Sequence, residues 1–338
     1  MANIHIPKPW ERISPKATEE KIYQDRRQIL KQLGLIGAGS LLLPTTLSAC
    51  MNPKDGQSSQ MAAPDQQAPD FHFEGEENFY PAKRNERYTL DRPLTEEYTA
   101  THYNNFYEFI SPKDRNIYNA YKYVGKFDTS DWQIEIAGHV EKKGKMHLGD
   151  IIKEMGTEER TYRFRCVERW SMAVPWTGFS LAKFIQYLQP TDKAKYIKFT
   201  SFASAKQMPG VANQDWYPWP YYEGLRMDEA MNEVALLATG IYGKPLPKQN
   251  GAPVRLVVPW KYGYKNIKSI VKMEFVSKQP QTFWNTIAPS EYPFVSNVNP
   301  AKPHPRWSQA QERMIPDGEP RPTLPFNGYG EFVASLYK

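Results

Sequence analysis

In Tyr162-Arg-Phe-Arg-Cys-Val-Glu-Arg-Trp-Ser171, a single cysteine stands among three arginines. The chain has only one other cysteine, Cys50, which lies at the end of an export leader. A mature domain with one thiol cannot close an internal disulfide, so Cys166 is buried and inert, paired with another chain, or used for chemistry. Guanidinium groups near a thiol favour the thiolate, which attacks electrophiles and binds soft metals. The arginines therefore favour a chemical role, and a buried, inert thiol stays the alternative.

Residues 1–50 have the order of a cleavable export signal. A charged segment, Asp25-Arg-Arg-Gln-Ile-Leu-Lys31, precedes the short apolar segment 33–43, which glycines interrupt. This apolar segment is too short for a membrane-spanning helix. The paired arginines match the twin-arginine type of signal, and a generic basic segment is the alternative. Because that pathway exports folded proteins, we expect a periplasmic protein that takes up any cofactor before export.

The end of the leader carries a second signal. Leu47-Ser-Ala-Cys50 resembles a lipobox, in which the cysteine becomes the lipidated first residue of the mature protein. Lipid on Cys50 would hold the protein at a membrane surface. We assign residues 51–75 to a flexible linker, because most of this stretch is polar and has almost nothing to bury. Without lipidation the same stretch is a disordered mature N-terminus, and both interpretations stay open.

Composition indicates a strand-rich domain over residues 76–338. Removal of residues 1–50 leaves 288 residues, enough by length for one large domain or two small ones. The leader holds seven of the 43 Lys and Arg and four of the 37 Asp and Glu, so the mature part has a formal net charge of +3. That charge does not indicate nucleic-acid binding. With 29 prolines and 14% aromatic residues, long irregular connections between strands are favoured over a helical bundle.

Local patterns predict an α+β arrangement. The alternation of Trp132, Ile134 and Ile136 with polar residues predicts a half-buried strand. We expect further strands at 162–166, 195–201, 234–238, 254–258 and 270–276, helices at 148–155 and from the N-cap Ser180 to Leu188, and a turn at 174–178. No GxGxxG, Walker, HExxH or CxxCH motif occurs, so nicotinamide, nucleotide, zinc-protease and c-type haem functions lack support.

Several blocks of the sequence carry a family resemblance. They are Arg165-Cys-Val-Glu-Arg-Trp-Ser-Met172, Val174-Pro-Trp-Thr-Gly178, Asn250-Gly-Ala-Pro-Val-Arg255 and Pro259-Trp-Lys-Tyr-Gly-Tyr-Lys265. The chain resembles the sulfite oxidase-type molybdopterin oxidoreductases and, among them, the bacterial periplasmic reductases of protein-bound methionine sulfoxide. The resemblance covers almost everything beyond about residue 90. It implies a β-rich, mixed α+β molybdopterin-binding fold as a single large catalytic domain over residues 76–338.

The resemblance gives Cys166 a role that suits its chemistry. In such enzymes one cysteine thiolate binds a molybdenum ion, which one pterin dithiolene also holds. A soft, anionic sulfur suits a metal that exchanges two electrons and an oxygen atom, while an open position accepts the substrate. We therefore expect Cys166 to be the metal ligand and a catalytic residue.

Further cofactor contacts follow from the resemblance. The expected residues are Asn104, Tyr107, Glu108, Asn250, Arg255, Asn266, Ile267 and Lys268, together with Ser201 where the family pattern has threonine. Arg and Lys suit a phosphate, and Asn and backbone amides suit the donor and acceptor edge of a pterin. Ordinary packing is the alternative for these positions, since asparagines also cap turns and tyrosines fill cores.

Glu168 lies two residues after the expected metal ligand. If the strand continued, its carboxylate would point to the same side as the thiol and could relay protons as a catalytic residue. The alternative is a salt bridge to Arg165 or Arg169. Aromatic residues are expected to wall the mouth of the site, with plain core packing as the alternative for many of them; they are Trp170, Trp176, Trp216, Tyr217, Trp219 and Tyr221. The irregular segment 208–222 would admit a sulfoxide carried on a protein.

The resemblance implies a reductase that repairs methionine sulfoxide in periplasmic proteins by oxygen-atom transfer to molybdenum. The chain has no haem or iron–sulfur ligand pattern, so electrons come from outside. In the family the donor is a haem-binding membrane subunit that draws on the quinone pool. Two other functions stay open. One keeps the metal and fold but acts on small S-oxides, N-oxides or sulfite, and the other is a non-catalytic copper-binding or ligand-binding lipoprotein.

Overall fold

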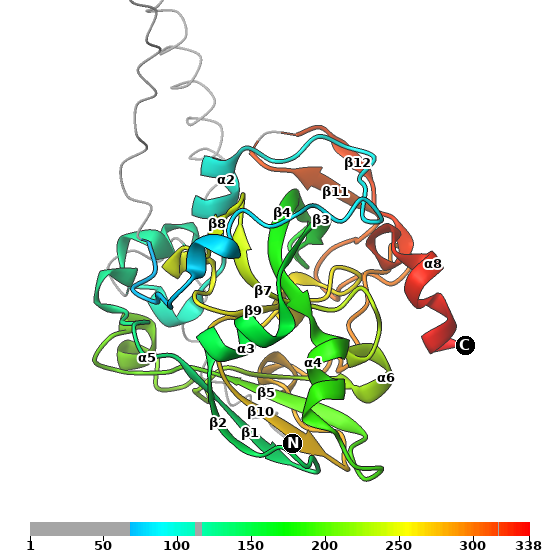
Figure 1. The fold of residues 1–338 in the computed structure, drawn as a ribbon. Helices are drawn as coiled ribbons and strands as arrows, with labels where there is room; N and C mark the ends of the chain where they lie inside the picture. Colours follow the sequence, from blue (N-terminus) through cyan, green and yellow to red (C-terminus); the bar gives the residue numbers. More distant parts are fainter. Residues whose placement is uncertain (1–67, 112–116, 317) are drawn as a thin grey trace, which may run out of the picture. The chain divides into compact units, whose positions relative to one another are not determined.

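Strand pairing organises the described residues into two sheets (Figure 1). The computed structural model describes residues 68–111, 117–316 and 318–338, which belong to one compact unit. One sheet has five strands in the order β2-β1-β10-β5-β6. The other has seven, in the order β12-β11-β4-β7-β8, with β3 paired to β4 and β9 paired to β7. The predicted leader, the Cys50 lipobox and most of the predicted linker lie outside the described residues.

The elements have the following bounds. The strands are β1 (Gln133–Gly138), β2 (Gly144–His147), β3 (Glu158–Arg165), β4 (Trp170–Ser180), β5 (Tyr196–Ser201), β6 (Tyr222–Arg226), β7 (Leu236–Ile241), β8 (Lys244–Pro245), β9 (Arg255–Val257), β10 (Ile270–Val276), β11 (Gln311–Met314) and β12 (Pro320–Pro322). The α-helices are α2 (Glu97–His102), α3 (Leu148–Met155), α4 (Leu181–Leu188), α5 (Pro209–Asn213), α6 (Met227–Ala230), α7 (Phe283–Ile287) and α8 (Gly330–Val333). Short 3₁₀ turns include η3 (Tyr107–Phe109), η6 (Lys248–Asn250) and η7 (Gly263–Lys265).

The predicted α+β class is confirmed, and so are several of its elements. The helix at 148–155 and the strand at 270–276 have the predicted bounds. The strands predicted at 195–201, 234–238 and 254–258 correspond to β5, β7 and β9 with shifted ends. Ser180 caps α4, since its side-chain oxygen accepts a hydrogen bond from the backbone N–H of Lys183 at 3.4 Å.

The predicted turn at 174–178 is wrong, because these residues form the middle of β4. Pro175 pairs with Thr161 of β3, and Thr177 pairs with Gly240 of β7. The register shifts after Thr177, and a Cβ at Gly178 would lie 2.1 Å from the carbonyl oxygen of Leu237. Glycine is therefore required there by close strand approach at a bulge rather than by a reversal of the chain. Strand β4 pairs with β3, β7 and β11, so it is central in the seven-stranded sheet, and all of its residues are buried.

The first described residues already contact the domain. Phe71 is buried in the core, and Asp70 Oδ2 lies 2.8 Å from Lys248 Nζ. Residues 68–75, which the sequence assigned to the linker, therefore include side chains that pack on the domain. The boundaries of the leader and the rest of the linker stay predictions.

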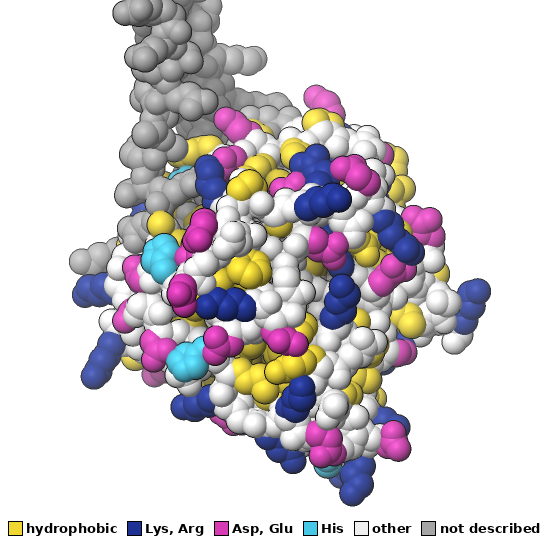
Figure 2. Space-filling view, viewed as in Figure 1, with side chains coloured by type: hydrophobic (Ala, Val, Ile, Leu, Met, Phe, Trp, Pro, Cys, Tyr) yellow, Lys and Arg dark blue, Asp and Glu magenta, His cyan; other side chains and the backbone are white. Residues whose placement is uncertain are grey.

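The surface carries mixed charge. On the face drawn in Figure 2, Lys and Arg side chains are interspersed with Asp and Glu. This pattern fits the modest net charge of the mature sequence. Within the described ranges, no helix is both long enough and apolar enough to cross a membrane.

Candidate active site

Cys166 lies in the tight turn that joins β3 to β4. Its backbone N–H donates to the carbonyl oxygen of Trp170 at 2.9 Å, and the N–H of Arg169 donates back to the Cys166 carbonyl at 3.0 Å. Arg169 has φ +74°, a left-handed conformation that closes the turn. The thiol is buried, with only 6% of Cys166 exposed. The long hairpin therefore presents one rigidly held sulfur at its end.

The turn also brings Glu168 beside the thiol. Glu168 Oε2 lies 3.7 Å from Cys166 Sγ and accepts hydrogen bonds from Asn105 Nδ2 at 3.0 Å and from Trp170 Nε1 at 3.1 Å. The strand ends at Arg165, so the turn, and not strand alternation, produces this proximity. In the part of the chain that the structure describes, Glu168 makes no ion pair with an arginine. The carboxylate is thus held in place by two neutral donors.

Asn105 is a site residue that the sequence did not indicate. Its side-chain nitrogen reaches both Glu168 and, at 3.9 Å, the sulfur of Cys166. Its backbone oxygen accepts a hydrogen bond from Lys268 Nζ at 2.6 Å. The available signal was its position next to Asn104 in the same aromatic block. Asn105 therefore links the thiol to the basic part of the site.

The arginine effect predicted on the thiol is present for Arg165 but is outweighed in the protein alone. Burial raises the pKa of the Cys166 thiol well above its usual value, the charge of Glu168 raises it further, and Arg165 only partly opposes them. Arg165 is fully buried and pairs with Glu312, with Arg165 Nε 3.2 Å from Glu312 Oε2. Arg163 pairs with Asp91 at 2.8 Å. Arg163 and Arg165 are thus paired with carboxylates, so a bound metal cation is the charge that would favour the thiolate.

Two buried basic residues lie at the first position of β9 and just before β10, namely Arg255 and Lys268. Desolvation lowers the pKa of Arg255 to about 9, and its Nη1 and Nη2 atoms donate to the backbone oxygens of Asn250 and Asn266 at 2.9 and 3.2 Å. Burial, together with the charge of Arg255, lowers the pKa of Lys268 to about 7. Neither side chain forms an ion pair with a described carboxylate. Arg255 is therefore buried without a carboxylate partner, whereas Lys268 feels the charge of nearby Glu108. Both side chains would suit an anion such as a phosphate.

Glu108 and Ser201 lie beside Lys268 in the same region. Burial raises the pKa of Glu108 to about 7, and the charge of Lys268 opposes that rise. Ser201 Oγ, at the end of β5, donates to Glu108 Oε1 at 3.4 Å. Tyr107 precedes Glu108 in η3, and burial followed by the charge of Glu168 raises the pKa of its hydroxyl well above the usual value. The hydroxyl predicted at position 201 is thus near other predicted cofactor residues.

Asn266 and Ile267 differ from this group. The Asn266 side chain accepts from the backbone N–H of Val258 at 2.7 Å and donates to the Tyr262 oxygen at 3.3 Å, so it stabilises the loop around η7. Ile267 is buried in the core, and its carbonyl accepts from the N–H of Leu256. The side-chain amide of Asn266 is thus engaged by the loop and does not contact Arg255 or Lys268. For polar contact with a cofactor, Asn266 and Ile267 offer their backbone atoms.

Unpartnered buried oxygens show that the site fits a polar cofactor. The side-chain oxygens of Asn104 and Asn250 have no hydrogen-bond partner among the described residues, and neither does Arg255 Nε. Such atoms are costly in a core unless a ligand pairs with them. A soft buried thiol, buried basic side chains and free amide oxygens match the metal, phosphate and pterin parts of a molybdenum–pterin group.

An aromatic cluster extends from this site to the surface. The rings of Tyr107 and Trp284 lie 5.0 Å apart, Tyr107 and Tyr217 lie 6.1 Å apart, and Tyr217 contacts Trp216 at 5.9 Å. Trp216 is 50% exposed. Of the other predicted wall residues, Trp219 and Tyr221 belong to the same cluster around Phe283, whereas Trp170 and Trp176 are buried.

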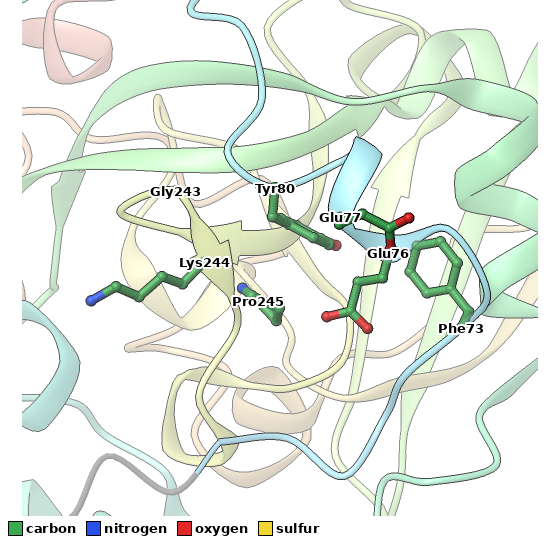
Figure 3. Close-up of a pocket in the computed structure, with 7 residues that line it drawn as sticks. All are labelled: Phe73, Glu76, Glu77, Tyr80, Gly243, Lys244 and Pro245. Carbon is green, nitrogen blue, oxygen red and sulfur yellow. The ribbon is translucent and has the colours of Figure 1, made fainter.

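A separate open cavity of about 500 Å³ lies between the segment that begins at Phe73 and the β7–β8 loop (Figure 3). Phe73, Glu76, Glu77, Tyr80, Gly243, Lys244 and Pro245 line it. None of the predicted site residues is among them. The chemistry argued above therefore belongs to Cys166 and its surroundings rather than to this cavity.

Comparison with known proteins defines the class. Residues 121–284 match the family model described as the oxidoreductase molybdopterin binding domain. This range includes Cys166, Glu168, Arg255 and Lys268. The protein is thus an oxidoreductase of the molybdopterin-binding class.

Curated relatives give the particular family. The chain is 45% identical to the protein-methionine-sulfoxide reductase catalytic subunit MsrP of Xanthomonas axonopodis pv. citri over 96% of this chain and 94% of that protein. It is 46% identical to the protein of the same name from Campylobacter jejuni over 95% and 96%. The chain belongs to this MsrP family. Among solved structures, the sulfane dehydrogenase SoxCD of Paracoccus pantotrophus aligns over 67% of this chain and 57% of that chain, at 17% identity and a TM-score of 0.40, which is too weak to inform the fold.

These findings confirm the predicted family, fold class and enzyme class. They also support molybdopterin as the class of cofactor. The roles of the individual residues, including Cys166 as metal ligand, stay predictions.

Proposed function

We propose that this protein reduces methionine sulfoxide residues of periplasmic proteins. The overall reaction consumes one sulfoxide, two electrons and two protons and yields methionine and water. The observation that carries the proposal is the buried thiol of Cys166 with the Glu168 carboxylate 3.7 Å away, in a chain of the MsrP family. When bound, one molybdenum with one pterin dithiolene supplies the two-electron oxygen-atom chemistry.

The chain itself contributes position, burial and a proton site. The hairpin turn holds the Cys166 sulfur as the single protein ligand, and Asn105 and Trp170 hold the Glu168 carboxylate toward it. Glu168 Oε2 would hold one of the two protons that the reaction consumes and would supply it to the oxygen that ends up in water, while the second proton comes from solvent. Arg255 and Lys268 hold the phosphate end, and Asn104 and Asn250 hold the pterin.

A protein-borne substrate is supported by the aromatic cluster. The half-exposed rings around Tyr217 and Trp216 form a platform that begins at Tyr107, beside the catalytic carboxylate. Aromatic side chains provide large, rigid contact area for an extended segment that carries an oxidised methionine. A small sulfoxide would not need a platform that reaches the surface.

The names of the relatives support a proposal for the electron donor, and the leader supports a proposal for the cellular location. The relatives are named catalytic subunits, which supports a second subunit. We propose that this partner is a haem-binding membrane protein, of the MsrQ type, that draws on the quinone pool. The twin-arginine leader supports export of the folded protein to the periplasm. Lipid on Cys50 would keep the enzyme near its electron donor.

The test begins with the metal and pterin content of the purified mature protein and of Cys166→Ala. Turnover is then measured with a reduced dye and an oxidised protein whose methionine sulfoxides are counted by mass spectrometry. We expect one molybdenum and one pterin per chain and sulfoxide-dependent dye oxidation, with turnover lost in Cys166→Ala. Asp91→Asn is the matched control and should behave as wild type. Asp91 forms an ion pair with Arg163, a residue of the same hairpin as Cys166, but does not contact the thiol.

Other outcomes would redirect the proposal. Molybdenum with turnover on sulfite or small N-oxides, but not on oxidised protein, would keep the cofactor and overturn the substrate. Copper, or no metal in protein made with ample molybdate, would overturn the reductase and favour a binding lipoprotein. Reduction by a quinol only when the haem-binding membrane subunit is present would support the electron route.

A further inference from the structure

Unpartnered side-chain atoms gather where α2 packs against η6. His102 ends α2, Asn104 follows it, and Gln249 and Asn250 lie in η6. All four residues are buried, and in each at least one polar atom lacks a hydrogen-bond partner among the described residues. The two segments are joined by a hydrogen bond from Asn250 Nδ2 to the carbonyl oxygen of Ala100 at 3.2 Å. The free atoms therefore belong to one region of the structure.

The free atoms of the two asparagines are acceptors. Asn104 Nδ2 donates to the Thr101 carbonyl at 3.2 Å, and Asn250 Nδ2 donates to the Ala100 carbonyl. Because a carbonyl oxygen can only accept, these contacts fix which end of each amide is nitrogen. The free atom is Oδ1 in both residues.

The same reasoning gives the tautomer of His102. Its Nδ1 lies 2.8 Å from the carbonyl oxygen of Tyr98, so Nδ1 carries the hydrogen and donates. In the neutral ring Nε2 is then a bare acceptor, and it is the atom without a partner. The ring stacks on Tyr98 with 4.0 Å between centroids, which fixes its orientation.

Gln249 completes the group. Its residue exposure is 0%, yet neither Oε1 nor Nε2 has a partner among the described residues. A buried amide with both ends free is rare in folded proteins, because each free group forgoes its hydrogen bonds with water. The region thus offers three fixed acceptors and one amide that can both accept and donate.

We propose that His102 and Gln249 bind the pterin of the cofactor, His102 Nε2 accepting from a pterin N–H group and Gln249 pairing with the pterin through both ends of its amide. A pterin carries an amino group and ring N–H groups, so it is rich in the donors that this acceptor-rich region lacks. Asn104 and Asn250, already expected as cofactor residues, supply the remaining acceptors. The inference rests on the class of cofactor and not on the substrate that is reduced.

The test compares His102→Phe and Gln249→Leu with wild type. Phe keeps the stacking on Tyr98, and Leu keeps most of the volume of Gln, so each variant removes hydrogen bonding with little change in packing. Two quantities are measured: the melting temperature of protein made without cofactor, and the rate at which fluorescent pterin leaves the loaded protein. Thr191→Val is the matched control, because Thr191 Oγ1 is also unpartnered but lies in the loop between α4 and β5.

For Gln249→Leu the two measurements should move in opposite directions. Without cofactor Gln249→Leu melts at or above the wild-type temperature, since it removes an amide that has no partner among the described residues. His102→Phe also loses the bond from Nδ1 to the Tyr98 carbonyl, so its melting temperature reports that loss as well and only its release rate tests the proposal. When loaded, both variants release pterin about tenfold faster, as expected for the loss of one hydrogen bond, and Thr191→Val releases it at the wild-type rate. Wild-type release rates in both variants would overturn the proposal. A lower melting temperature of cofactor-free Gln249→Leu would also overturn it, because it would indicate a structural role for that amide.

The outcome is independent of the reductase proposal. If wild type holds molybdenum and pterin but does not turn over oxidised protein, the proposed substrate fails while the release rates still test His102 and Gln249. If the variants release pterin normally while wild type reduces oxidised protein, only this inference fails.

Discussion

Glu168 Oε2 lies 3.7 Å from Cys166 Sγ because both residues belong to the turn between β3 and β4, not because they alternate along a strand. The carboxylate is oriented by Asn105 from the segment before η3 and by Trp170 from the start of β4. A proton site is therefore held beside the expected metal ligand, and no arginine among the residues the structure describes forms an ion pair with it.

Glu168→Gln should separate catalysis from cofactor binding. The amide keeps the shape of the side chain but cannot carry the proton, so turnover should fall about 100-fold, while molybdenum content stays at the wild-type level. The measurement is dye-coupled turnover per bound molybdenum. Glu154→Gln, on an exposed position of α3, is the control and should match wild type. Unchanged turnover in Glu168→Gln would exclude a proton role for this carboxylate.

Arg255→Met should stabilise the protein made without cofactor and weaken its cofactor binding. Burial lowers the pKa of Arg255 from 12.5 in the unfolded chain to about 9 in the folded protein. At neutral pH the buried charge therefore lowers the free energy of unfolding, and this loss is relieved only when the pH rises above the folded pKa. Removing the charge should raise the free energy of unfolding of the cofactor-free protein by about 2 kcal/mol. Denaturant titration and pterin content measure the two effects.

Arg165→Met provides the contrast. Arg165 is equally buried but pairs with Glu312, so its removal should destabilise the cofactor-free protein by about 3 kcal/mol. Equal shifts for both arginine variants would contradict the view that Arg255 lacks an anion in the protein alone.

Cofactor retention should weaken as pH rises above neutral. Without cofactor, the pKa of Lys268 is lowered to about 7, and a bound phosphate would raise it again. Above pH 7 the binding of cofactor is therefore accompanied by the uptake of a proton by Lys268. The affinity for the cofactor should fall by up to about tenfold per pH unit, until Lys268 is neutral in both the free and the cofactor-bound protein. Glu108 acts in the same direction, because its pKa of about 7 means that it becomes an anion over the same range.

Pterin release measured between about pH 6 and pH 9 tests this dependence. Lys268→Met should bind more weakly throughout and show a shallower pH dependence. Retention that is constant or rises with pH in wild type would contradict a phosphate contact by Lys268.

Trp216→Ala should affect the binding of protein substrates. Trp216 is 50% exposed and contacts Tyr217 at the outer end of the aromatic platform, so its loss should not disturb the fold. We expect the KM for an oxidised protein to rise about fivefold with kcat unchanged, which is the pattern for an interaction made equally in the ground and transition states. An unchanged KM would show that substrates dock elsewhere.

Local chemistry predicted many elements but not the long central strand. Ser180 and the apolar pattern after it predicted α4, because capping and helix periodicity act within a few residues. Pro175 and Gly178 are ordinarily turn residues, and the sequence offered no sign that β7 approaches them closely. Only the pairing of β4 with β3 and β7 showed that Pro175 and the bulge residue Gly178 lie inside a strand.

By itself, the sequence determined the family and therefore the class of fold and cofactor, because the blocks around Cys166, Asn250 and Pro259 are specific combinations of residues. It also indicated which residue would hold a soft metal, since the mature chain has one thiol. The tertiary structure alone decided the surroundings of that thiol. Burial, which raises its pKa, the orientation of Glu168 by Asn105, and the unpartnered acceptors of α2 and η6 all depend on segments distant in the chain. Desolvation and hydrogen bonding depend on which atoms are brought together in space, and no pattern of neighbouring residues specifies that.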